Sequence, residues 1–243
     1  MPSPVARTEP SGRQLHGELR AFILTAQARP GAALSETIVA ERFGISRTPV
    51  REVFQRLADE GLLRIVPQVG TFVAPISLEA VYDSQFVRET LECRAVALAA
   101  RNATDRSVRQ LRDHLSAQAK RIARRDHVGF FASDEAMHRT IMEIAGHPGV
   151  WQLIASAKVQ LDRLRYLSLE SADWLTMIFD QHRDIVALIA AKDHRRVAKA
   201  MRTHLRTAFA AIERIAHENQ DFFEGVRSPP PAARRKARGS NKQ

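Results

Sequence analysis

Residues 34–73 read LSETIVAERFGISRTPVREVFQRLADEGLLRIVPQVGTFV, and this stretch decides the fold. Its pattern predicts two helices joined by a tight turn and followed by a hairpin of two short strands. Gly44 permits the turn, and Ser46 is an N-cap residue for the second helix. We expect the strands at 62–66 and 71–74.

The second predicted helix has two distinct faces. Arg47, Thr48 and Arg51 share one of them, and the two arginines lie one turn apart. Another face is apolar and would anchor the helix: Val50, Phe54 and Leu57. The helix therefore offers two guanidinium groups to solvent from a firmly packed base.

This arrangement suits the reading of DNA. An α-helix fits the major groove, and arginine can bond bidentately to the O6 and N7 atoms of guanine. Arg47 stands at the helix N-terminus, the end that a recognition helix points at base edges, and Thr48 can bond a phosphate or contact a thymine methyl group. Gly70 at the hairpin tip leaves no side chain to block close approach to a groove. The stretch predicts a winged helix-turn-helix. The alternative is that Arg47 and Arg51 only form a solvated helix face, and the surrounding helix-turn-helix and hairpin pattern makes DNA contact the better interpretation.

Net charge adds little to this interpretation. The chain carries a formal charge of +10, but residues 226–243 alone hold six basic and no acidic residues. Residues 1–76 hold nine arginines against seven acids, so the expected DNA-binding region is only weakly basic. We interpret this tail as a solvated coil. The alternative is that it attracts DNA phosphates nonspecifically.

The sequence predicts a soluble cytoplasmic protein without a membrane partner. The single Cys93 cannot form an internal disulfide, which fits a reducing compartment. The first 14 residues contain no apolar core of a signal peptide. No apolar run approaches the roughly 18 residues that span a bilayer.

We expect a mainly α fold, in which the winged helix-turn-helix precedes an antiparallel all-helical bundle. The predicted divisions are a disordered N-terminus at 1–12, the DNA-binding domain at 13–75, the helical domain at 77–225 and a basic disordered tail at 226–243. Capping and breaking residues divide the bundle into six predicted helices: 77–102, 105–124, 127–145, 149–168, 173–191 and 194–218.

One polar set in the helical part has the composition of a metal site. Asp134 and His138 are four residues apart, so they project from one face of a helix, and His182 and His204 lie on the last two predicted helices. Three imidazoles and a carboxylate suit Zn, Ni, Co, Mn or Fe rather than Ca or Mg. The alternative is that they are hydrogen-bonded core residues.

Residues 13–75 resemble the N-terminal domain of GntR-type bacterial regulators. The GISRTPVRE core and the trailing GTFV are the specific matches. The resemblance implies that Arg47, Thr48 and Arg51 touch operator DNA and that Gly70 approaches the minor groove; Ser46, directly before them, is assigned to the same surface.

Residues 77–217 resemble the FCD effector domain of the FadR-like branch of that family. Its signature is an Asp-x-x-x-His on one helix and a histidine on each of the last two helices, which here are Asp134, His138, His182 and His204. Many members bind a divalent cation in a central cavity, so the resemblance implies a transition metal, with zinc first and Ni, Mn, Co or Fe as alternatives. Arg88, in FVRETLECRAVALAA, matches a family arginine near the pocket and would meet a small carboxylate effector. Its alternative is a surface ion pair with Glu92, four residues on.

These features predict a metabolite-responsive transcription regulator, a repressor that binds a pseudo-palindromic operator as a homodimer and is not an enzyme. A metalloenzyme that uses Asp134 and the three histidines is one alternative, although the sequence offers no evident general base or lid beside them. The other is a DNA-binding protein that responds to no effector.

Overall fold

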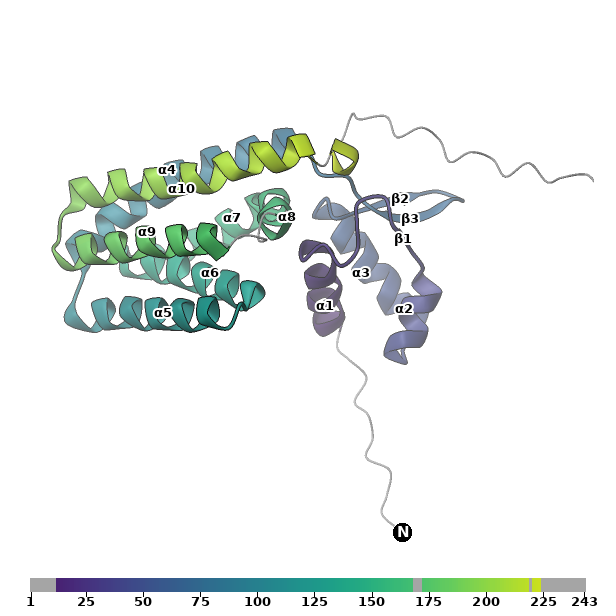
Figure 1. Ribbon diagram of the computed structural model, residues 1–243. Coiled ribbons are helices and arrows are strands. Elements are labelled where there is room, and N and C mark those ends of the chain that lie inside the picture. The colour runs from purple at the N-terminus through teal and green to yellow at the C-terminus, as the bar shows by residue number, and fades with distance from the viewer. Residues whose placement is uncertain (1–11, 168–171, 219, 224–243) are drawn as a thin grey trace, which may run out of the picture.

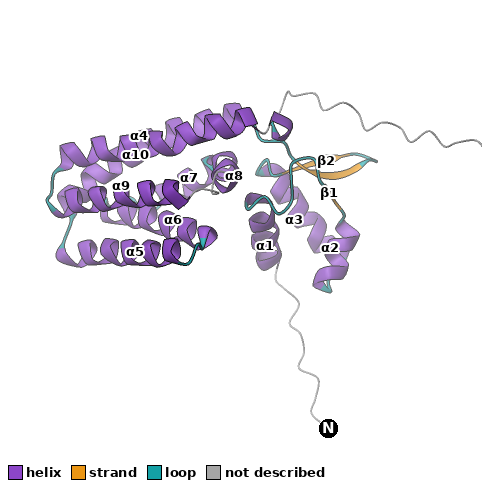
Figure 2. Cartoon of the chain, viewed as in Figure 1, coloured by secondary structure: helices purple, strands orange, loops and turns teal. Residues whose placement is uncertain are grey.

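The computed structural model describes residues 12–167, 172–218 and 220–223. The predicted disordered segments at 1–12 and 226–243 lie outside these residues, except that Gly12 begins the first helix. Figures 1 and 2 show a small mixed region of helices and strands beside a larger helical bundle. The first region contains α1 (Gly12–Leu24), β1 (Ala33–Leu34), α2 (Glu36–Phe43), α3 (Arg47–Asp59), β2 (Leu63–Val66) and β3 (Gly70–Val73).

Local chemistry explains the turn between α2 and α3. The side chain of Ser35 accepts a hydrogen bond from the amide of Ile38 at 3.4 Å and so begins α2. Gly44 ends α2 with a φ of +67°, a conformation that favours glycine. Ser46 occupies the N-cap position of α3 with extended backbone, but its hydroxyl makes no capping hydrogen bond. The predicted cap is thus present in position but not in bonding.

The predicted hairpin is present, and a third strand joins it. β2 and β3 pair antiparallel, with Leu63 opposite Val73 and Val66 opposite Gly70. β1 pairs with the other edge of β3, which gives the strand order β1-β3-β2, drawn in orange in Figure 2. β1 was not expected from the sequence, because two residues are too few to produce an alternating pattern.

Within the described residues, the bundle contains one more helix than predicted. The segment 149–168, expected as one helix, is divided at Lys158, whose buried ammonium pairs with Glu135 and Asp162. No glycine or proline marks this break, so the sequence pattern did not indicate it. The helices are α4 (Leu78–Asn102), α5 (Asp105–Ala123), α6 (His127–Ile144), α7 (Val150–Ala157), α8 (Val159–Leu167), α9 (Ala172–Ala190) and α10 (His194–Glu218), followed by the short 3₁₀ turn η1 (Gln220–Phe222).

The mainly α fold, with a winged helix-turn-helix and a helical bundle, is confirmed. α4 and α10 run alongside each other, and below them in Figure 1 α5 packs against both α6 and α9. The bundle core contains side chains that are at most 1% exposed: Val96, Leu111, Met137, Ile141, Ile185, Ile189, Val197 and Leu205. In the part of the chain that the structure describes, no helix is both long and apolar enough to cross a bilayer.

We expect Leu111→Ala to lower the free energy of unfolding by about 2–5 kcal/mol, because truncation of a fully buried leucine leaves a cavity. Leu153→Ala is the matched control on α7, where the leucine is 65% exposed, and its effect should stay within about 0.5 kcal/mol. Chemical denaturation followed by circular dichroism measures both changes. Equal losses for the two variants would contradict this assignment of the bundle core.

Candidate functional site

The helix α3 exposes the residues assigned to DNA. Ser46, Arg47, Thr48 and Arg51 are all exposed, and the side chains of the two arginines are 58% and 68% accessible. The helix is held by a buried face whose members are at most 2% exposed: Val50, Val53, Phe54 and Leu57. The geometry therefore provides two accessible guanidinium groups on a rigid support.

Glu36 connects the two arginines. Its carboxylate accepts hydrogen bonds from Arg47 Nη2 at 3.1 Å and from Arg51 Nη2 and Nε at 3.3 and 3.4 Å. The hydrogen bond from Arg51, together with the contribution of Arg47, outweighs partial burial and lowers the pKa of Glu36. This contact could not be predicted from the sequence, because Glu36 and Arg51 are fifteen residues apart and lie on opposite sides of the turn.

The hairpin supplies a second exposed element. Gly70 begins β3 with a φ of +146°, a conformation that side-chain-bearing residues rarely adopt, and a Cβ atom there would lie 3.7 Å from the ring of Phe72. Val69, beside it at the tip, is 70% exposed. In Figure 1 the tip of the hairpin projects beyond α2 and α3. The glycine is thus accessible, as an approach to a groove requires.

The helical bundle brings the four predicted metal ligands together. Asp134 and His138 come from α6, His182 from α9 and His204 from α10, and one ligand atom from each lies within 4.8 Å of the others. His182 Nε2 is 3.2 Å from Asp134 Oδ1 and 3.4 Å from His204 Nε2, while His138 Nε2 is 3.6 Å from Asp134 Oδ1. All four residues are at most 2% exposed. The bundle thus collects one oxygen and three nitrogen donors at one buried point.

The outer nitrogen of each imidazole has a separate partner. His138 Nδ1 contacts Glu92 Oε2 at 2.5 Å. The other two rings use amide oxygens, at 2.8 Å for His182 Nδ1 with Gln118 and 3.2 Å for His204 Nδ1 with Gln181. These contacts fix the ring orientations and leave each Nε2 facing the cluster, the arrangement that metal-binding histidines have.

Two atoms of the cluster lack hydrogen bonds. Asp134 Oδ1 and His138 Nε2 are both buried without a hydrogen-bond partner in the structure. A buried polar atom without a partner costs about 1–3 kcal/mol, so native proteins rarely keep one without a reason. A coordinated cation would satisfy both atoms. The donor set, one carboxylate oxygen and three imidazole nitrogens, fits a divalent transition metal.

Burial sets the protonation states of the cluster. It lowers the pKa of His182, and it lowers that of His204 further with help from the neighbouring imidazoles. Burial opposes ionisation of Asp134, but Arg165 and the imidazoles hold its pKa well below the usual range. Neutral His182 and His204 and an ionised Asp134 are the forms that bind a cation.

Glu92 joins Arg88 to the cluster. Its Oε1 accepts a hydrogen bond from Arg88 Nε at 2.6 Å, and its other oxygen contacts His138. The side chains of Arg88 and Glu92 are 3% and 1% exposed, so this pair, expected on the surface as an alternative, is buried. Burial opposes ionisation, yet Arg88 and His138 lower the pKa of Glu92 to about 2. Against the effect of burial, Glu92 and Asp134 raise the pKa of His138.

Three residues that surround the ligands were not expected from the sequence, and Glu92 was expected only as a surface partner of Arg88; the three are Gln118, Arg165 and Gln181. One signal was available for Gln118. It follows Leu115 by three residues and precedes Ile122 by four, in the apolar stripe of α5, where a polar side chain indicates a buried hydrogen bond. Arg165 gave no comparable signal, although its Nη2 donates to Asp134 Oδ2 at 2.5 Å.

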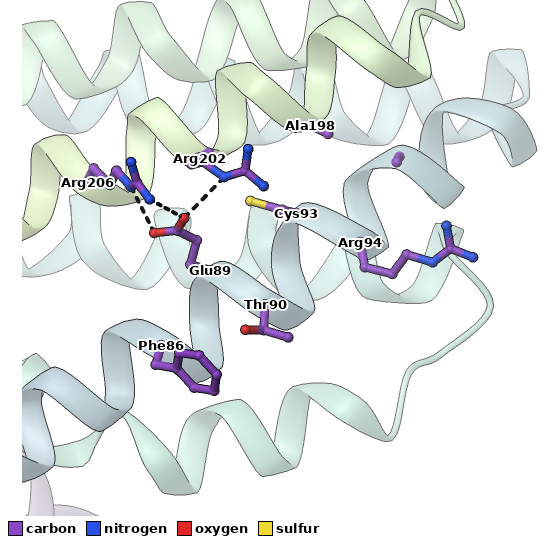
Figure 3. Close-up of a pocket in the computed structure, with 9 residues that line it drawn as sticks. Phe86, Glu89, Thr90, Cys93, Arg94, Ala198, Arg202 and Arg206 are labelled. Carbon is purple, nitrogen blue, oxygen red and sulfur yellow. Dashed lines mark hydrogen bonds and ion pairs between the residues drawn. The ribbon is translucent and has the colours of Figure 1, made fainter.

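A surface hollow of about 730 Å³ between α4 and α10 is a weaker candidate (Figure 3). Glu89 accepts hydrogen bonds from Arg206 at 2.8 and 3.0 Å and lies 3.1 Å from Arg202 Nε, so both guanidiniums already have a carboxylate partner within the protein. Cys93 borders the hollow, and burial raises the pKa of its thiol to about 11. The thiol is therefore protonated and poorly nucleophilic near pH 7.

The chain is similar to known proteins over most of its length. It is 38% identical over 222 residues to an uncharacterised HTH-type transcriptional regulator in an unstable DNA locus of Streptomyces ambofaciens, and the match covers 91% of this chain and 93% of that protein. It is 35% identical over 216 residues to the HTH-type transcriptional repressor RspR of Escherichia coli K12, with 89% and 95% covered. The solved structure of E. coli McbR/YncC has a TM-score of 0.73 at 21% identity, covering 84% and 97%, which shows a shared fold.

Two family models match the chain in succession. Residues 12–73 match the bacterial regulatory proteins of the gntR family, and residues 83–207 match the FCD domain. These families and relatives are transcriptional regulators, so the expectation that the chain is not an enzyme is confirmed and the metalloenzyme alternative is wrong. The chain belongs to the GntR family of bacterial regulatory proteins and is a DNA-binding transcriptional regulator with an FCD domain.

Proposed function

We propose that this regulator is a cytoplasmic homodimeric repressor whose affinity for a pseudo-palindromic operator is modulated by a small organic acid bound at a metal site. The observation that carries the proposal is the presence, in one chain, of an exposed arginine face on α3 and a buried cluster of one carboxylate and three imidazoles. The named relative RspR is a repressor, which supports the same sign of regulation here.

The proposed DNA contacts follow from the exposed atoms of α3 and the hairpin. Arg47 and Arg51 would bond base edges in the major groove, Ser46 and Thr48 would bond backbone phosphates, and Gly70 would allow the hairpin to approach the minor groove. One winged helix offers few base contacts. Two-fold pairing doubles them, which is the reason for proposing a homodimer and a pseudo-palindromic operator.

Asp134, His138, His182 and His204 are the proposed ligands of a divalent transition metal, with zinc as the first candidate. When bound, such a cation supplies an open coordination position for a carboxylate oxygen. The chain's own contribution is the orientation of the donors: Glu92, Gln118 and Gln181 each hold the outer nitrogen of one imidazole.

Arg88 is the proposed partner of the carboxylate of the effector. Its Nε already donates to Glu92, but a guanidinium carries five N–H donors, so the Nη groups are the ones proposed to meet an anion. Glu92 would keep the guanidinium in place during this contact. A regulator without an effector is the remaining alternative, and it predicts no thermal shift with any metal or organic acid.

We expect Arg51→Ala to weaken binding to a duplex selected in vitro with the wild-type protein by about 1–3 kcal/mol per half-site, because a bidentate base contact is lost. Zinc content should stay at the wild-type value, since α3 lies outside the bundle. Arg183→Ala, at an exposed arginine of α9, is the control and should bind the duplex like wild type. Fluorescence anisotropy measures the affinities. Wild-type affinity in Arg51→Ala would refute the assigned reading face.

The zinc site gives the converse prediction. His182→Ala removes a ligand, so the variant should lose stoichiometric zinc while it keeps its helical content and some DNA binding. Glu92→Gln retains all four ligands but weakens the orientation of His138, so zinc affinity should fall by about 10- to 100-fold. Competition with a chromophoric chelator measures both. Zinc bound by His182→Ala as tightly as by wild type would rule out the proposed site.

A further inference from the structure

We propose that α8 couples the metal-ligand cluster to the winged helix-turn-helix, with Arg165 as its contact to the cluster and Arg163 as its contact to the DNA-binding region. This inference rests on the proposed function, because it needs both a cation site and a DNA site. It adds the physical link between them and assigns a positioning role to residues that touch neither ligand.

On the cluster side, α8 shares a carboxylate with the proposed cation. Arg165 Nη2 donates to Asp134 Oδ2 at 2.5 Å, while Asp134 Oδ1 faces His182 at 3.2 Å. The guanidinium of Arg165 is packed 4.5 Å from the ring centroid of Phe131. Asp134 therefore divides its charge between α8 and the imidazoles, and a change at one oxygen alters what the other can offer.

A second ion pair runs parallel to the first. Lys158, at the break before α8, pairs with Glu135 on α6 and with Asp162 on α8. Glu135 directly follows Asp134 in the chain, so two consecutive residues of α6 hold α8. A shift of this turn of α6 would therefore be transmitted to α8 as a whole.

On the DNA-binding side, α8 holds both ends of the wing. Arg163 Nη2 donates to Ala74 O at 2.7 Å and its Nη1 to Pro75 O at 3.3 Å, directly after β3. Gln160 Nε2 donates to Gly61 O at 2.8 Å, at the turn between α3 and β2. The turn after the recognition helix and the segment after the wing are thus both hydrogen-bonded to α8.

Apolar packing makes this contact continuous. Val159 of α8 is 5% exposed and belongs to the core of the winged helix-turn-helix, against which Tyr166 also packs. Leu161 and Leu164 pack in a separate small core with Ile76, which follows the wing. α8 is therefore buried against the DNA-binding region and the segment that connects it to the bundle.

The length of α8 suits it to this role. It has nine residues, so it spans about 14 Å as one stiff unit. Gln160 and Arg163 are three residues apart and share a face, and Gln160 Oε1 accepts a hydrogen bond from Arg163 at 3.1 Å. Arg165 lies two residues further, about 200° around the helix, and so points the opposite way. One face contacts the wing while the other contacts the cluster.

The test is a linkage experiment on the full-length protein. Zn²⁺ affinity is measured by chelator competition with and without a duplex that wild type selects from a random pool, and duplex affinity is measured with and without Zn²⁺. Reciprocity requires the same coupling factor from both measurements, and for wild type we expect about 5- to 150-fold. If wild type bound neither Zn²⁺ nor duplex, the proposed function and this inference would fail together. If wild type bound both but showed no coupling between them, this inference alone would fail.

Arg163→Gln isolates the inference. It removes the contact with Ala74 and Pro75 but leaves the four ligands and α3 intact, so each ligand alone should bind within about twofold of wild type. The coupling factor should fall towards one. Arg183→Gln is the matched control and should keep the wild-type factor. If Arg163→Gln bound both ligands and kept full coupling, α8 would not be the link, although the proposed function would stand.

A second variant keeps the test decisive should Arg163→Gln fail to fold. Gln160→Ala removes the hydrogen bond to Gly61 and the one accepted from Arg163, but it keeps the contacts of Arg163 with Ala74 and Pro75, so it should lower the coupling factor partly, with both single affinities retained. Arg163→Lys keeps a donor and should restore part of the coupling that Arg163→Gln loses. A purely structural role would predict reduced melting temperatures with an unchanged coupling factor, and that result would overturn the proposal.

Discussion

The carboxylate of Asp134 is the constraint on which the centre of the bundle depends. An ionised carboxylate that is 1% exposed is strongly unfavourable unless opposite charge or hydrogen-bond donors surround it. Arg165 compensates one oxygen, and the other oxygen faces His138 and His182. One oxygen is thus compensated by α8, and the other is left to two imidazoles, of which burial keeps His182 neutral by lowering its pKa. The side of Asp134 that faces the histidines is therefore where a cation would contribute most.

The same alternation of charge extends outward from His138. Glu92 lies between His138 and Arg88, so a negative group separates an imidazole from a guanidinium in a row of buried side chains. Removal of any one member would leave its neighbour buried and unpaired, which costs about 3–5 kcal/mol. The row ties α4 to α6 and gives the orientation of His138 a structural cause. The same side chains therefore orient a proposed metal ligand and hold two helices of the bundle together.

Local sequence signals explain what could be predicted. The turn at Gly44, the apolar face of α3 and the N-caps of α5 and α6, which are Thr104 and Asp126, depend on neighbours within four residues, and the structure contains them all. The four clustered side chains could be grouped from an i,i+4 pair and a family signature. The partners of those side chains could not, because Arg165 reaches Asp134 across 31 residues and Glu92 reaches His138 across 46. Such contacts are set by helix packing, which periodicity does not encode.

The arginine face of α3 is held by a contact of the same kind but at the surface. Glu36 bonds both Arg47 and Arg51 at 3.1–3.4 Å, yet the arginine side chains remain more than half exposed. A surface ion pair of this type contributes only about 0–1 kcal/mol, so exchange of the carboxylate for phosphate or guanine costs little. The contact nevertheless restricts two long side chains to one region of space before DNA arrives. Part of the conformational entropy that binding would otherwise remove is thus already lost in the free protein.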